Sequence, residues 1–142
     1  MKRAATRKLG SWLVPTVLGP IAGMVLLLIA RVALGSGSAL GLFGWLPVGL
    51  GAAVALGITL LLTDVLLLAL RLRLPPTGAR AWLASSAAVL PFGLCWSLLR
   101  PPLLSSPWSH VLAVAAALIL AALGTRLLGS PRTSAGMRFA SR

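Results

Sequence analysis

Four apolar stretches, each long enough to cross a lipid bilayer, are the feature of this sequence that most restricts its fold. A membrane span needs roughly 20 predominantly apolar residues to cross a hydrocarbon core that is roughly 30 Å thick. The stretches run from about Trp12 to Leu34, Leu46 to Leu70, Ala81 to Leu99 and Trp108 to Leu128. Short segments rich in Gly, Pro and Ser separate them, as is typical of connections between helices.

The composition also indicates a membrane protein. Of the 142 residues, 58% are apolar and only 10% are charged, and the mean hydropathy is +1.00. A soluble domain carries roughly 25% charged residues, so most of this chain must face lipid. Spans in lipid satisfy their backbone groups internally, and the alternating pattern of a β-barrel is absent. We therefore expect an all-α integral membrane protein in which four transmembrane helices form an up-down bundle with short loops.

This reading divides the chain into three parts. Residues 1–11 form a basic N-terminal segment, residues 12–128 the transmembrane domain, and residues 129–142 a flexible basic tail. The N-terminal region also resembles a signal peptide, but its apolar run exceeds the usual roughly 7–15 residues and Arg31 lies where small residues are expected at a cleavage site. We expect a first span that is retained.

The basic residues predict the orientation. Thirteen Lys and Arg stand against one acid, and all but Arg31 and Arg100 fall at the two chain ends or in the second connection. Because cytoplasmic loops collect Lys and Arg, both termini should be cytoplasmic. So strong a bias disfavours an antiparallel dimer of oppositely inserted copies. The composition, rich in Arg, Ala, Gly and Leu, is typical of GC-rich bacterial genomes, so we expect the bacterial cytoplasmic (inner) membrane.

Aromatic and basic side chains are expected at the two membrane surfaces. Tryptophans collect at such interfaces, with Trp12 and Trp82 near the inner surface and Trp45, Trp96 and Trp108 near the outer one. Anionic lipids attract cations beside a span. We therefore predict that Arg71, Arg73 and Arg80, in the second connection, contact lipid headgroups.

Small residues recur at every fourth position in three spans, where they share one helix face. They are Gly19 and Gly23 in the first span, Gly49, Ala53 and Gly57 in the second, and Ala113, Ala117 and Ala121 in the fourth. Membrane helices associate through such residues because they let backbones approach closely. Packing within the bundle and docking against a partner subunit both remain open.

Proline also lies inside spans, at Pro15, Pro20 and Pro91. Each proline removes a helical hydrogen-bond donor, so we expect kinks at these positions. Ser85 and Ser86 lie close enough to Pro91 to help satisfy freed backbone groups.

Asp64 is the only acid in the chain, and it lies inside the second span. Burying its charge in lipid costs at least a few kcal/mol. By helix rise, Asp64 lies about 25 Å below Pro47 and Arg126 about 24 Å below His110, so Asp64 and Arg126 can meet at one depth. Three interpretations remain open for Asp64: an interhelical ion pair with Arg126, a contact to a proton, ion or substrate, and a side chain that reaches water.

Reactive groups are otherwise scarce. The chain has one cysteine, Cys95, and one histidine, His110, which lies near the outer surface and far from Asp64. The sequence contains neither paired carboxylates nor a phosphate-binding Gly-Lys loop. We expect no metal site, no cofactor and no enzyme confined to this chain, although lipid-headgroup chemistry completed by another chain remains open. Nucleic-acid binding is not expected, because the basic residues do not form one face.

Two functions fit these observations. The leading one is a non-catalytic multi-pass membrane subunit or assembly factor, which packs against a larger membrane complex through its Gly/Ala ridges. The alternative is a small oligomeric transporter or channel component that uses Asp64. The expected partners are the lipid bilayer and either another integral membrane protein or a second copy of this chain. The sequence identifies neither a solute nor a partner complex.

Overall fold

The computed structural model is all-helical and describes residues 2–35, 37–99 and 106–129. Its helices are α1 (Lys2–Ala33), α2 (Ala39–Ala69), α3 (Ala79–Ala87), α4 (Val89–Leu99) and α5 (Pro107–Gly129). In the described part, four helical segments are long and apolar enough to span a membrane, with α3 and α4 together forming the third. The predicted fold class, a bundle of four transmembrane helices, is confirmed.

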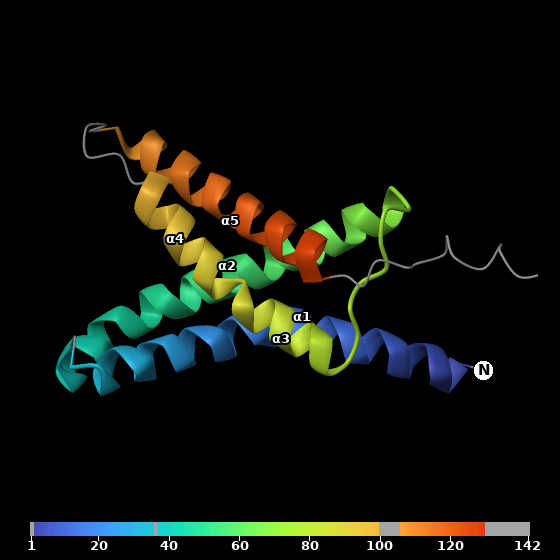
Figure 1. The fold of residues 1–142 in the computed structure, drawn as a ribbon, viewed down its shortest axis with the longest axis horizontal. Helices are drawn as coiled ribbons and strands as arrows, with labels where there is room; N and C mark the ends of the chain where they lie inside the picture. Colours follow the sequence, from blue (N-terminus) through green and yellow to red (C-terminus); the bar gives the residue numbers. More distant parts are fainter. Residues whose placement is uncertain (1, 36, 100–105, 130–142) are drawn as a thin grey trace, which may run out of the picture.

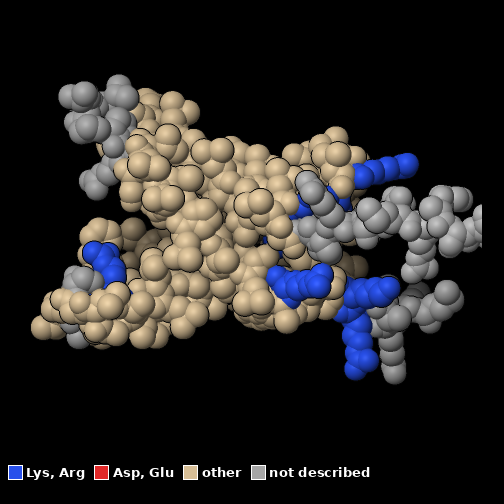
Figure 2. Space-filling view, in the orientation of Figure 1, with Lys and Arg blue, Asp and Glu red and all other residues tan. Residues whose placement is uncertain are grey.

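The helices run alternately up and down (Figure 1). The start of α1, the α2–α3 connection and the end of α5 lie at one end of the molecule, whereas the α1–α2 connection lies at the other. The described Lys and Arg side chains gather mainly at the first end (Figure 2), which we call the basic end. Arg31, in the last turn of α1, lies at the opposite end.

Two helices begin earlier than the apolar pattern suggested. α1 begins at Lys2 instead of near Trp12, because Lys, Arg and Ala are good helix formers and extend the helix beyond the apolar run. α2 begins at Ala39 instead of near Leu46, where the side chain of Ser38 accepts a hydrogen bond from the Gly41 amide at 3.2 Å. This cap stabilises the start of the helix, although the Gly and Pro residues of the segment are typical of a loop.

The third span is interrupted at Ala88, between α3 and α4. Pro91 lies one turn beyond Ala87 and lacks the amide that would bond to the Ala87 carbonyl. The interruption lets the two halves pack on different neighbours: α3 lies against α1, and α4 lies along α5 (Figure 1).

The core lies where α2, α4 and α5 meet. Its larger side chains are Leu56, Leu60, Val89 and Phe92, and alanines of α5 fill the space between them. Most other large apolar side chains are exposed on the outside of the bundle. This arrangement suits a chain whose surroundings are hydrocarbon, because lipid leaves only close packing and polar contacts to hold helices together.

Candidate functional site

An ion pair between α2 and α5 lies inside the bundle. Arg126 Nε is 3.0 Å from Asp64 Oδ1, and the two side chains are only 1% and 2% exposed. The structure therefore brings together the two residues that the depth estimate placed at a common level. It places the only acidic residue of the chain away from the lipid-facing surface.

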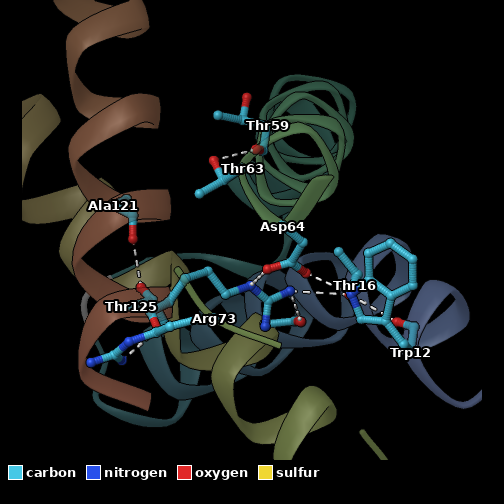
Figure 3. Close-up of polar contacts among 10 residues, drawn as sticks. Trp12, Thr16, Thr59, Thr63, Asp64, Arg73, Ala121 and Thr125 are labelled. Carbon is cyan, nitrogen blue, oxygen red and sulfur yellow. Dashed lines mark hydrogen bonds and ion pairs between the residues drawn. The ribbon is translucent and has the colours of Figure 1, made fainter. Parts of the chain in front are cut away.

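The other two spans also contribute to this site (Figure 3). Trp12 Nε1 on α1 donates a hydrogen bond to Asp64 Oδ2 at 2.6 Å. Arg126 Nη2 donates to Thr16 Oγ1 on α1 at 3.0 Å and lies 3.4 Å from Ser85 Oγ on α3. These five residues, Trp12, Thr16, Asp64, Ser85 and Arg126, are called the polar cluster below. The cluster links all four membrane spans.

Sequence reasoning missed three members of the polar cluster. Trp12 was interpreted as an interfacial anchor and Ser85 as a partner for freed backbone groups, whereas both side chains contact the ion pair. Thr16 also donates to the Trp12 carbonyl at 2.8 Å. One sequence feature could have identified Trp12 and Thr16 as members of the cluster. They lie four residues apart on one helix face, at the depth expected for Asp64.

The polar cluster offsets the cost of holding two charges away from water. A buried ion pair is tolerated only when its geometry is good and further hydrogen bonds satisfy the remaining lone pairs and protons. Here Trp12 satisfies the second carboxylate oxygen, and two hydroxyls face Arg126 Nη2. Arg126 Nη1 is buried without a hydrogen-bond partner in the described part of the chain, and Arg126 Nε contacts Asp64 as an ion pair without forming a hydrogen bond.

Neighbouring threonines bond to their own helices. Thr63 Oγ1 donates to the Thr59 carbonyl at 2.7 Å (Figure 3). Thr59 Oγ1 donates to the Ala55 carbonyl at 2.8 Å. Thr125 Oγ1 donates to the Ala121 carbonyl at 2.6 Å. These bonds satisfy the hydroxyl protons within each helix.

The predicted small-residue ridges lie at contacts between helices of this chain. A Cβ built at Gly19 would lie 2.3 Å from Ser85 Cβ, and one at Gly23 would lie 2.5 Å from the Ser86 carbonyl oxygen. Ser86 Oγ also donates to the Gly19 carbonyl at 3.1 Å. The α1–α3 contact therefore depends on these two glycines.

The other ridges also face neighbouring helices. A Cβ at Gly57 would lie 3.0 Å from the Val17 carbonyl oxygen, and one at Gly49 would lie 3.3 Å from the Met24 side chain. The ridge alanines are buried, and they are Ala53, Ala113, Ala117 and Ala121. These ridges are consequently occupied by intramolecular packing, so a partner subunit would need a different face.

The three arginines predicted to contact lipid headgroups lie at the basic end, in different settings. Arg73 Nη1 donates to the Leu127 carbonyl and lies 3.4 Å from the Arg126 carbonyl, so it caps the end of α5. Arg71 is exposed just after α2 with a φ of 54°. Arg80 is exposed in the first turn of α3.

Histidine and cysteine are scarce among the described side chains. Within residues 2–35, 37–99 and 106–129, no group of three or more His, Cys, Asp or Glu could hold a metal ion. His110 is exposed near the start of α5, and Cys95 is a half-buried free thiol on α4. The side chains of the polar cluster neutralise each other's charge and form hydrogen bonds.

Replacing Trp12 by Phe should lower the free energy of unfolding by about 1.5–3 kcal/mol, because hydrogen bonds to charged groups contribute that much. The measurement is unfolding of the purified protein in mixed micelles with a rising fraction of denaturing detergent. Trp82→Phe is the matched control, since the Trp82 side chain is 39% exposed on α3. Equal effects of the two substitutions would show that the bond to Asp64 contributes nothing specific.

Comparison of the chain with models of protein families, with curated proteins and with solved structures gave no significant match.

Proposed function

We propose that this chain is a non-catalytic multi-pass membrane subunit or assembly factor of a larger membrane protein complex. The observation that carries the proposal is the engagement of Asp64. The only acid of the chain is held in an internal ion pair and hydrogen-bonded by Trp12. A carboxylate held in this way is already neutralised by Arg126, and the chain has no second acidic side chain to act as a proton or cation carrier.

The surface available to a partner is the outside of the bundle. Because the Gly/Ala ridges are used internally, a partner helix would pack on side chains that otherwise face lipid. On α2, Gly51 is exposed, and a Cβ built there meets nothing within 4 Å. A substitution at Gly51 therefore changes the outer surface without disturbing contacts inside the bundle.

Purification of the tagged chain in mild detergent from its native organism tests this proposal. We expect a larger integral membrane protein at fixed stoichiometry, whose assembly fails when the chain is deleted. Asp64→Asn should lower partner assembly only as far as it lowers the amount of folded chain. The amount of assembled partner per folded chain should therefore stay constant. Gly51→Leu changes the outer surface of a chain that remains folded, so it tests whether partner assembly depends on a contact at that surface. A chain that purifies alone, with no complex altered by its deletion, would contradict the proposal.

A second candidate is a small oligomeric transporter or channel component, which one observation favours. Arg126 Nη1 is buried without a described partner, and the threonines of α2 lie within five residues of Asp64 on the same helix. A transported anion or water chain would use such donors and lone pairs. Flux into vesicles that is lost in a folded Asp64→Asn variant, with the purified chain forming a homo-oligomer, would favour this candidate over the first.

The proposed location is the bacterial cytoplasmic membrane, with both termini cytoplasmic. Arg7→Cys and Gly37→Cys, each made with Cys95→Ser, place one exposed thiol at either end of the bundle. In intact cells, a membrane-impermeant maleimide should label the variant at position 37 and spare the variant at position 7 until the membrane is permeabilised. The opposite pattern would reverse the orientation.

A further inference from the structure

A groove opens on the outside of the bundle between the third span and α5. It encloses about 750 Å³ and is lined by Ala84, Ala87 and Pro91 on one side and by Gly124 and Leu128 on the other. The groove follows from the interruption at Ala88, because α3 turns toward α1 while α4 stays beside α5 (Figure 1). Small residues on both walls leave the space unfilled.

The length of the groove matches one leaflet of a bilayer. Arg80 lines it at the basic end, and Pro91 lines it eleven residues further along the third span. At a helical rise of 1.5 Å per residue, that separation is at most about 16 Å, because the span is interrupted at Ala88. Half of a hydrocarbon core of roughly 30 Å is about 15 Å. An acyl chain that enters from the surface at the basic end would therefore reach the bilayer centre at Pro91.

The charge at the mouth of the groove favours an anion. Arg80 is exposed there, and Arg73 caps the carbonyls at the end of α5, next to Leu128. The only acidic side chain of the chain, Asp64, is buried against Arg126, so no carboxylate side chain is left to compete for Arg80. A guanidinium presents paired donors that match the geometry of a phosphate.

We propose that this groove binds one anionic phospholipid from the leaflet at the basic end. One acyl chain lies between the third span and α5, and the headgroup phosphate contacts Arg80. The inference does not depend on the proposed function, because a subunit and a transporter would both carry such a lipid.

Native mass spectrometry of the full chain, purified in mild detergent, tests the proposal. The probes are phosphatidylglycerol and phosphatidylcholine with identical acyl chains, titrated separately. We expect one phosphatidylglycerol per chain, bound more tightly than phosphatidylcholine. Arg80→Gln should weaken phosphatidylglycerol binding about fivefold, since a cation near the membrane surface contributes about that factor. Arg7→Gln is the matched control, because Arg7 is exposed on α1 and does not line the groove.

A second pair of variants tests the acyl-chain contact. A Cβ built at Gly124, which lines the groove, meets nothing within 4 Å, so Gly124→Leu places a side chain in the groove. A Cβ built at Gly93, which does not line the groove, also meets nothing within 4 Å. Gly124→Leu should weaken binding of both lipids, whereas Gly93→Leu should not. Ala87→Trp blocks the same space from the opposite wall if Gly124→Leu does not purify in folded form.

Three results would overturn the proposal. Equal loss with Arg7→Gln and Arg80→Gln would mean that attraction to the lipid surface is general. Unchanged binding in a folded, groove-filled variant would exclude the acyl-chain site. A dimer that disappears when the groove is filled would show that a second copy of the chain occupies it.

Discussion

Replacing Arg126 by Met is expected to lower the free energy of unfolding by about 3–5 kcal/mol, because it leaves the Asp64 carboxylate buried without its counter-charge. Asp64 is only 2% exposed in its side chain, so water cannot replace the guanidinium without opening the bundle. Trp12 Nε1 still donates one hydrogen bond to Asp64, which compensates only part of the loss. Unfolding in mixed micelles measures the effect, and Arg7→Met serves as an exposed control.

The double variant Asp64→Leu/Arg126→Met should be markedly more stable than Arg126→Met alone. Replacing a whole buried ion pair by apolar side chains is often neutral or stabilising, whereas removing one partner is costly. Recovery should stay incomplete, because Trp12, Thr16 and Ser85 lose the groups that they contact. A double variant less stable than Arg126→Met would mean that the two charges do not compensate each other.

Replacing Gly19 by Ala is expected to destabilise the protein by about 1–3 kcal/mol, the range for overpacking a well-packed site. The added Cβ would lie 2.3 Å from Ser85 Cβ and 3.3 Å from the Ser85 backbone, which cannot move without the helix. α3 must therefore shift away from α1. That shift also separates Ser86 Oγ from the Gly19 carbonyl and moves Ser85 relative to Arg126.

Gly51→Ala is the matched control for Gly19→Ala. It adds the same methyl group to a span, but at Gly51 a Cβ meets nothing within 4 Å. Alanine is favoured over glycine inside a helix by about 0.5–1 kcal/mol, so the control should be neutral or stabilising. The two substitutions should thus change the unfolding free energy in opposite directions, and equal effects would contradict close packing of α1 on α3.

The helix ends show which features of the fold the apolar pattern predicts and which it does not. Runs of apolar residues identify the four spans, because transfer into lipid depends on local composition over about 20 residues. The same runs place the starts of α1 and α2 too late, since helix propensity at Lys2 and the Ser38 cap do not depend on hydropathy. Pro91 signals a kink, but the sequence does not say that the halves on either side of Ala88 pack on different helices.

For the polar cluster, the sequence supplied the depth of Asp64 and Arg126 through helix rise, and with it the possibility that they meet. It did not indicate that Trp12 bonds to Asp64, because an interfacial tryptophan and a buried donor have the same sequence signature. The hydrogen bond and the ion pair at Asp64 together require α1, α2 and α5 to converge at one level with particular rotations about their axes.

Composition and segment length alone therefore predict a helical membrane protein with four spans, because these two properties decide which segments are stable in lipid. Only the tertiary structure decided which small residues face each other, which hydroxyls surround Arg126, and where the third span leaves a groove beside α5. The reason is physical. Hydrophobic transfer acts on each segment alone, whereas close packing and hydrogen bonding depend on how several helices cross and rotate.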